Sequence, residues 1–150
     1  MIRPLVIIGY GNTLRGDDAL GWHAAQQLSE HNADGLVVEV CQQLTPELAE
    51  VISRARGVAF LDACLGGDPG VVHVTAVEPS AVSGDSLTHH LTPGTLLALA
   101  QTLYGTCPPA VVFSISAENF ELGSSLTPRV EAALSALVRR VQEWIAEQSA

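Results

Sequence analysis

The fold of this chain is decided by residues 5–21, which read LVIIGYGNTLRGDDALG. The apolar run 5–8 is typical of a strand that is buried on both faces of a parallel sheet. Glycines follow at once and predict a tight turn, and the apolar spacing over 20–28 predicts a helix. Two neighbouring carboxylates, Asp17 and Asp18, stand where that helix begins. The stretch therefore predicts a strand and a helix that present acidic groups at their junction.

Four further apolar segments predict strands, and they alternate with segments that predict helices. We expect the later strands at 36–41, 58–61, 71–77 and 110–115, and the later helices at 45–57, at 92–103 and from 127 onward. Each of these helices opens on a Thr-Pro pair, which places a capping residue before a proline. This alternation predicts the α/β class: a three-layer sandwich with helices on both faces of a mostly parallel, twisted sheet. No linker or repeat divides the chain, so we expect one domain over residues 1–150.

The composition narrows the class of partner. The chain has 150 residues, enough to bury a core, and 47% of them are hydrophobic while 15% are charged. Its net charge of −9 combines 16 acidic residues with 7 arginines, and the sequence has no lysine. Because nucleic acids are bound through basic patches, this charge disfavours them as partners.

The cysteines indicate a compartment. Cys41, Cys64 and Cys107 are odd in number, widely spaced and without a CxxC pair, which fits a reducing cytoplasm and excludes a cysteine-rich metal site. Residues 1–4 lead straight into the first strand and show no signal-peptide pattern. No apolar run approaches the roughly 20 residues that span a bilayer. We therefore expect a cytoplasmic protein with no membrane partner.

Acidic residues follow two of the expected strands. Asp62 comes directly after the strand 58–61, as Asp17 and Asp18 come after the strand 5–8. The carboxyl ends of parallel strands share one edge of the sheet, where ligands bind, so an acid from each loop should meet there. A helix cap accounts for one of the two neighbouring acids. We interpret Asp17 as the cap and Asp18 as the functional group.

Two adjacent histidines, His89 and His90, lie in the loop before the helix expected at 92–103. Beside Asp18 and Asp62, one imidazole would complete a set of two oxygens and one nitrogen that suits a divalent transition metal. The pattern leaves open which of the two it is, and a solvent-facing position is the alternative for both. The other histidines have no comparable neighbours and are interpreted as structural or surface residues: His23, His31 and His73.

The glycines allow a different interpretation. Gly9-Tyr10-Gly11 resembles the opening of a dinucleotide-binding turn, but the third glycine of that pattern would fall on Leu14. A P-loop requires a lysine, which the sequence lacks. A tight turn from strand to helix is the simpler interpretation, and a nucleotide-binding α/β protein is the less favoured one.

Taken together, the motifs resemble those of a known family, the hydrogenase maturation proteases. They are Gly9-x-Gly11-Asn12-x-Leu14-x-x-Asp17-Asp18-x-x-Gly21, then Asp62 closing the third strand, then Thr88-His89-His90-Leu91. The segment 123–128 also resembles the one that opens the last helix of that family. The resemblance covers essentially the whole chain, with matching order and spacing.

The resemblance implies an endopeptidase that removes a short C-terminal extension from the precursor of a nickel–iron hydrogenase large subunit, after nickel insertion. It implies that the substrate supplies the nickel and that Asp18, Asp62 and His89 contact it and carry the catalysis, with His90 as the alternative to His89. It also implies a five-stranded sheet, in agreement with the strands above. We expect a monomer whose partner is this precursor. The alternative function is a non-catalytic nickel checkpoint or delivery protein for the same subunit.

One segment departs from the family pattern. The family often carries a Gly-Gly-Thr-like turn after its second strand, where residues 41–45 here read CQQLT. This loop should lie at the same edge of the sheet as the acids and touch the substrate, as should the loop 84–91. The resemblance therefore does not predict which large subunit is processed.

Overall fold

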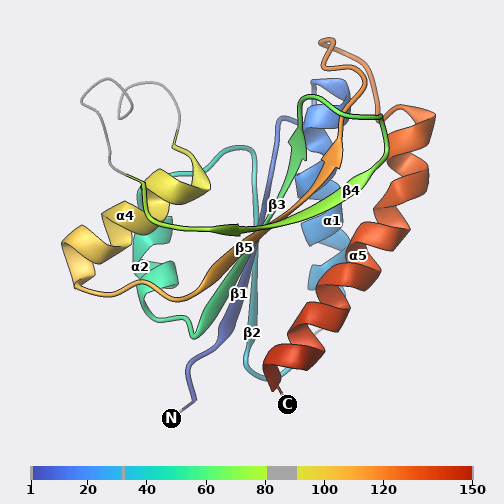
Figure 1. Cartoon of the computed structure of the whole chain (residues 1–150). Coiled ribbons are helices and arrows are strands. Elements are labelled where there is room, and N and C mark those ends of the chain that lie inside the picture. Colours follow the sequence, from blue (N-terminus) through green and yellow to red (C-terminus); the bar gives the residue numbers. More distant parts are fainter. Residues whose placement is uncertain (1, 32, 81–90, 150) are drawn as a thin grey trace.

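A five-stranded sheet lies between two pairs of helices in the computed structural model of the chain (Figure 1). The structure describes residues 2–31, 33–80 and 91–149. Its strands are β1 (Leu5–Tyr10), β2 (Leu36–Cys41), β3 (Gly57–Cys64), β4 (Val72–Val77) and β5 (Ala110–Ser116). Its helices are the 3₁₀ turn η1 (Gly16–Ala19) and α1 (Leu20–Ser29), α2 (Leu48–Ser53), α4 (Pro93–Tyr104) and α5 (Pro128–Ser149).

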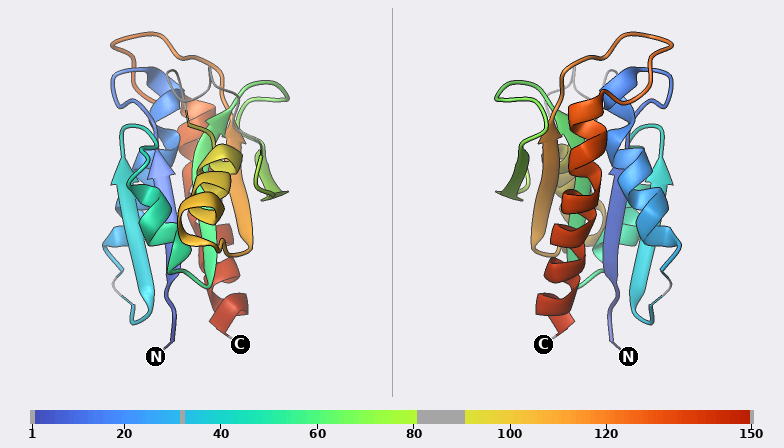
Figure 2. Two further views of the ribbon diagram at one scale, coloured as in Figure 1. Left: turned by 90° about the vertical axis from the view of Figure 1, so that its left-hand side faces the viewer. Right: turned by 90° about the vertical axis from the view of Figure 1, so that its right-hand side faces the viewer.

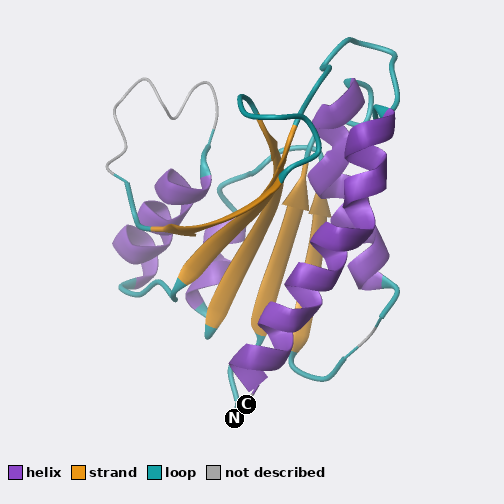
Figure 3. Ribbon diagram, turned by 45° about the vertical axis from the view of Figure 1, so that its right-hand side comes forward, coloured by secondary structure: helices purple, strands orange, loops and turns teal. Residues whose placement is uncertain are grey.

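The sheet has the strand order β2-β1-β3-β5-β4. The pairs β1–β2, β1–β3 and β3–β5 are parallel, and β4 joins β5 as an antiparallel edge strand. Figures 2 and 3 show α1 and α5 on one face of the sheet and α2 and α4 on the other. The expected α/β sandwich with a mostly parallel sheet is confirmed.

Each face of the sheet has its own apolar core. Ile7 of β1 points towards α1 and α5, where it joins Leu20 and Phe113, and Ile8 points the other way, where it joins Phe60. All these side chains are almost completely buried. Burial of a side chain of this size is worth about 1.5–3 kcal/mol, so a strand that is apolar on both faces is held firmly in the middle of the sheet.

Gly9 and Gly21 let α1 touch the sheet at backbone distance. A Cβ atom on Gly21 would collide with the backbone carbonyls of Leu61 and Tyr10, and one on Gly9 would collide with the carbonyl of Gly21. The distance between α1 and the two central strands is thus set by backbone contact, which only glycine permits. These motif glycines therefore serve the close packing of the helix that follows the acids.

The Thr-Pro starts are confirmed for two of the three helices. α4 begins at Pro93 with a capping box, in which Thr92 Oγ1 accepts from the Thr95 N–H (3.2 Å) and the Thr92 N–H donates to Thr95 Oγ1 (2.8 Å). α5 begins at Pro128, as expected. α2 begins only at Leu48, so the prediction that Thr45 caps it is wrong.

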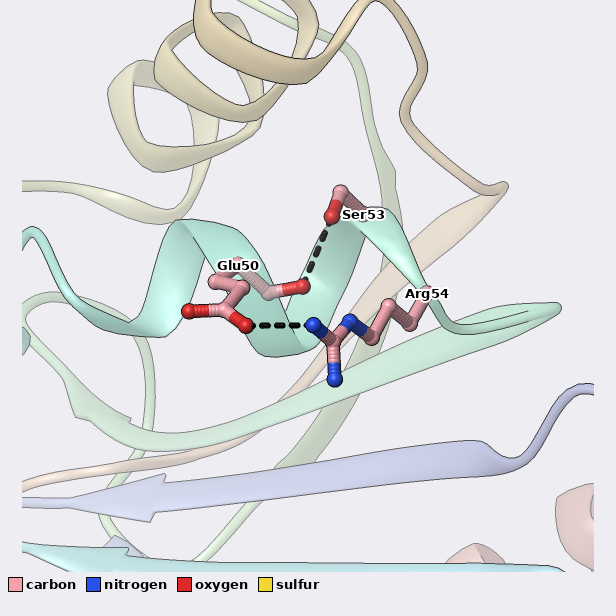
Figure 4. A network of polar contacts seen from close by, with 3 residues as sticks. All are labelled: Glu50, Ser53 and Arg54. Atoms are coloured by element: carbon pink, nitrogen blue, oxygen red, sulfur yellow. Dashed lines mark hydrogen bonds and ion pairs between the residues drawn. The ribbon is translucent and has the colours of Figure 1, made fainter.

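The short helix α2 depends on its neighbours. Figure 4 shows its last turn, where Ser53 Oγ donates to the Glu50 carbonyl (2.7 Å) and Arg54 pairs with the Glu50 carboxylate (2.6 Å). Both charged side chains are exposed, so this pair adds at most about 0.5 kcal/mol. A helix of six residues is not stable alone, and the burial of Ala49 and Ile52 in the core shared with α4 holds it in place.

Two strands differ in detail from the expectation. β3 continues past the apolar run and ends at Cys64, because Asp62 and the residues after it still pair with β5. β4 begins at Val72, one residue later than expected, and its Val74 is 41% exposed. No helix in the described part of the chain is long and apolar enough to cross a membrane.

Replacing Gly21 by alanine should destabilise the protein by about 3 kcal/mol, because the new methyl group meets two backbone carbonyls that cannot move aside. Gly105→Ala is the matched control. Its φ of 78° strains an alanine but nothing lies within 4 Å of the new Cβ, so it should cost only about 1 kcal/mol. Urea unfolding measures both, and equal losses would show that backbone contact does not set the position of α1.

Candidate functional site

A cleft of about 790 Å³ opens at the carboxyl ends of the parallel strands. Its walls come from the loops that follow β1, β2 and β3 and from the start of α4. Asp18 and Asp62 both line it, so the two carboxylates that the sequence placed at one edge of the sheet do share one cavity. This is the position where open α/β sheets bind their ligands.

Asp18 is held by the glycine loop itself. It lies in η1, and its Oδ2 accepts a hydrogen bond from the backbone N–H of Asn12 (2.8 Å). Asn12 Oδ1 in turn accepts from the Leu14 N–H (2.9 Å), so the loop is closed by short local bonds. The other oxygen, Asp18 Oδ1, accepts no hydrogen bond from the described residues. Oδ1 is therefore the more available oxygen for a ligand, and Oδ2 keeps one acceptor position.

Asp62 has a donor on each of its oxygens. Oδ1 accepts from the N–H of the next residue, Ala63 (2.8 Å), and Oδ2 accepts from the hydroxyl of Tyr10 (2.9 Å). Each carboxylate oxygen has two acceptor positions, so both oxygens keep one for a ligand in the cleft. Tyr10 was missed by the sequence reasoning. Its only signal was a hydroxyl-bearing side chain between two glycines at the end of the first strand.

Burial changes how these two groups titrate. Burial, the largest cause, raises the pKa of Asp62 from 3.8 to about 6, and the charge of Asp18 adds to the rise. The hydrogen bonds from Tyr10 and the Ala63 N–H act in the opposite direction. Burial together with the Asp62 charge also raises the pKa of the Tyr10 hydroxyl far above its ordinary range. The Tyr10 hydroxyl therefore stays protonated at neutral pH and donates to Asp62.

The register of the sheet brings these side chains together. Tyr10 is paired with Cys41 of β2, and Asp62 is paired with Ser114 of β5, which is paired in turn with His73 of β4; the β1–β3 pairing ends one residue earlier, at Gly9 and Leu61, so Tyr10 follows beside Asp62. Paired residues point to the same face, so this row crosses the whole sheet on the side covered by α2 and α4. Of this row, Tyr10 and Asp62 line the cleft.

Asp17 is not the helix cap that its position suggested. No side chain caps η1 or α1. The Asp17 carboxylate is completely buried and accepts from the backbone N–H groups of Glu118 (2.8 Å), Asn119 (3.0 Å) and Thr127 (2.7 Å). The Thr127 hydroxyl donates to it as well, at 2.9 and 3.0 Å from its two oxygens. Asp17 therefore ties the acidic loop to the segment before α5.

Backbone bonds extend this connection to the neighbouring loops. The Asp17 N–H donates to the Asn119 carbonyl (2.9 Å), and the Gly16 N–H donates to the Ser124 carbonyl (3.1 Å). On the other side, the Thr13 N–H donates to Gln42 Oε1 (3.2 Å). The acidic loop is thus the middle of three connected loops.

The histidine part of the predicted site lies outside the described residues. His89 and His90 both fall in the segment 81–90. Within the described ranges, no three His, Cys, Asp or Glu side chains gather into a group that could hold a metal ion. The structure therefore brings together Asp18 and Asp62, and the imidazole assigned to this set stays a prediction.

One serine does lie beside a histidine. His73 Nε2 and Ser116 Oγ are 2.8 Å apart, and Cys64 Sγ lies 3.8 Å from the same hydroxyl. Ser116 is completely buried, so its hydroxyl cannot reach a peptide bond and this pair is structural. Of the acidic residues in the described part of the chain, Asp18 and Asp62 line the cleft. Carboxylate oxygens suit a cation, or a water molecule that must lose a proton.

This fold occurs in solved structures of hydrogenase maturation endopeptidases. HybD from E. coli superposes with a TM-score of 0.78 at 19% identity, over 97% of this chain and 93% of that chain. The maturation protease HycI from Thermococcus kodakarensis KOD1 gives 0.77 at 22% identity, over 94% and 91%. The hydrogenase 2 maturation peptidase of a Thaumarchaeota archaeon gives 0.71 at 22% identity, over 96% and 99%.

The resemblance found in the motifs is thus confirmed at the level of the fold: the chain has the architecture of these endopeptidases over nearly its whole length. No family model matches the sequence. No curated protein sequence matches it either.

The same substitution should change the stability of the protein strongly at one of the two neighbouring acids and hardly at all at the other. Asp17→Asn turns an NH₂ group towards buried donors, and we expect a loss of about 3 kcal/mol in the free energy of unfolding. Asp18→Asn changes a partly exposed group with one hydrogen bond and should stay within about 0.5 kcal/mol of the wild type. Chemical denaturation measures both. Equal effects would contradict the division of roles.

Asp62→Asn should stabilise the protein at pH 8 by about 3 kcal/mol. The folded pKa of about 6 lies above the unfolded one, so the native state holds this proton more tightly. The resulting stabilisation is fully present below about pH 4 and is lost as the pH rises through about 6. Asparagine avoids that loss because it carries no charge, so the advantage of the variant should vanish below about pH 4. Unfolding curves at both pH values measure it, with exposed Asp34→Asn as control, and an advantage independent of pH would contradict this cause.

Proposed function

We propose that this protein is an endopeptidase that removes the C-terminal extension of a nickel–iron hydrogenase large-subunit precursor after nickel has been inserted. One observation carries the proposal: Asp18 and Asp62 line a single cleft in a chain with the fold of HybD and HycI. Both acids stand at the positions that the family resemblance assigned to metal contact. The alternative of a nucleotide-binding protein has less support, because the sequence lacks the lysine of a P-loop and carries Leu14 where a dinucleotide-binding turn has its third glycine.

In this proposal the nickel belongs to the substrate. Asp18 offers the oxygen that accepts no bond from the described residues, and Asp62 offers the remaining acceptor position of each of its oxygens. His89 would add an imidazole nitrogen, with His90 as the alternative. Two oxygens and one nitrogen leave room for the ligands with which the precursor itself holds the metal.

The carboxylates also fit the chemistry of peptide hydrolysis. A water molecule must lose a proton as it attacks the scissile carbonyl, and a base with a pKa somewhat below neutral serves this step best. Asp62 keeps an acceptor position on each oxygen, so one oxygen can contact the metal while the other takes that proton. The nickel of the precursor would supply Lewis acidity to the carbonyl or the water.

The order of events follows from this arrangement. A precursor without nickel would bring no metal ion to the oxygens of Asp18 and Asp62, and the contact that fits these oxygens would be missing. We propose that the missing contact discriminates against cleavage before the metal is in place.

The three cysteines are free thiols, in keeping with our proposal that processing takes place in the cytoplasm.

Alanine substitution of the three proposed nickel contacts should abolish processing. We expect Asp18→Ala, Asp62→Ala and His89→Ala each to lower kcat/KM for the nickel-loaded precursor at least about 100-fold, since each removes a contact to the metal. Asp34→Ala, an exposed acid outside the cleft, is the matched control and should leave the rate unchanged. Wild-type rates in all three variants would overturn the proposed site.

The mass of the precursor before and after incubation distinguishes the two candidate functions. A protease shortens the precursor, whereas a nickel checkpoint or delivery protein binds it and leaves its mass unchanged. The measurement uses wild-type protein with precursor loaded with nickel and with precursor kept free of it. Shortening of both forms at equal rates would contradict metal recognition, and shortening of neither would contradict the protease function.

A further inference from the structure

We infer that Tyr10 is a positioning residue, whose hydroxyl fixes the Asp62 carboxylate in the orientation that presents its remaining acceptor positions to a divalent metal ion in the cleft. The inference rests on the proposed metal contact of Asp62, but it does not require that the protein cleaves anything. Neither the motifs nor the family resemblance assigned Tyr10 a role.

The geometry that supports this comes from the sheet register. β1 and β3 are neighbouring parallel strands, and their pairing sets Gly9 beside Leu61 and so Tyr10 beside Asp62. The Tyr10 hydroxyl reaches Asp62 Oδ2 at 2.9 Å, and both side chains line the cleft. Tyr10 is thus the side chain that meets Asp62 from the neighbouring strand.

The second donor to Asp62 cannot do this alone. The Ala63 N–H binds Oδ1 and belongs to the same strand, one residue further on. With that single bond the carboxylate could still rotate about its Cβ–Cγ bond, because this torsion is broad for Asp. A donor on the other oxygen removes that freedom. Tyr10 supplies it, and both oxygens then keep one acceptor position in a fixed direction.

Tyr10 is itself held firmly enough for this task. Tyr10 is the last residue of the buried strand β1, and its ring packs against the apolar core under α2 and α4. Its hydroxyl is a donor at neutral pH, as an ordinary tyrosine hydroxyl is. The ring of a phenylalanine could make the same apolar contacts, so the hydroxyl adds nothing to packing and serves the carboxylate.

The test compares two tyrosine variants. Tyr10→Phe removes the hydroxyl and keeps the ring, and Tyr104→Phe does the same to a tyrosine that is 49% exposed at the end of α4. Isothermal titration with nickel chloride at pH 7 measures affinity for the metal alone. We expect Tyr10→Phe to weaken Ni²⁺ binding about 10-fold, the usual cost of losing a partner of a ligand, and Tyr104→Phe to leave it unchanged.

A double-mutant cycle separates positioning from a general structural effect. If Tyr10 acts through Asp62, then Tyr10→Phe should have almost no further effect on Ni²⁺ affinity once Asp62→Asn is present. A 10-fold loss in both backgrounds would overturn the inference, as would wild-type affinity in Tyr10→Phe. A wild-type protein that binds no Ni²⁺ would overturn it too, because no metal would then need the carboxylate.

The same proteins keep this inference separate from the proposed function. If the wild-type protein leaves the nickel-loaded precursor intact, the protease proposal fails while the coupling of Tyr10 and Asp62 in Ni²⁺ binding can still hold. If processing occurs but the cycle is additive, the protease proposal stands and the role of Tyr10 is refuted. Thermal unfolding of each variant, followed by circular dichroism, verifies that the proteins compared are folded.

Discussion

The site depends on the hydrogen bonds that the buried carboxylate of Asp17 accepts. A charged group without exposed surface is stable only when its oxygens are fully bonded, and here the N–H groups of Glu118, Asn119 and Thr127 meet it. Because Asp17 lies next to Asp18, this anchor also fixes the position of Asp18. The two motifs that lie farthest apart in the chain, the acidic pair and the segment before α5, are thus two halves of one contact.

The loops and the helix at this edge of the sheet are held rigidly, but the Asp62 carboxylate between them is buried at a cost in stability. The acidic loop is bonded to the loops on both sides of it, and α1 sits on the sheet through backbone contact at Gly21. Within that frame, Asp62 is kept in a buried position that raises its pKa, which lowers stability at neutral pH. Such a cost is typical of a site where a carboxylate is kept ready for a ligand.

The sequence predicted the architecture and the two acids because both follow from local rules. Apolar runs and Thr-Pro signals located the strands and most helix starts, and the shared edge of parallel strands brought Asp18 and Asp62 together. Tyr10 could not be found this way, since its partner is set by register between strands 52 residues apart. Asp17 was misassigned for a similar reason: the cap rule is local, whereas its partners lie 101 to 110 residues away. α2 starts later than its Thr-Pro signal because packing, not capping, decides where so short a helix forms.

The backbone contact between α1 and the sheet has a consequence for how such a protein can diversify. Side chains in a core can be exchanged with small shifts of the surrounding elements, but a helix that rests on carbonyl groups through Gly21 has no side chain to exchange. The positions of the groups in the cleft therefore do not depend on which side chains fill the core beneath it. Homologous or designed sequences can drift widely in that interior while the two carboxylates stay in register, so the same geometry can survive at low overall sequence identity.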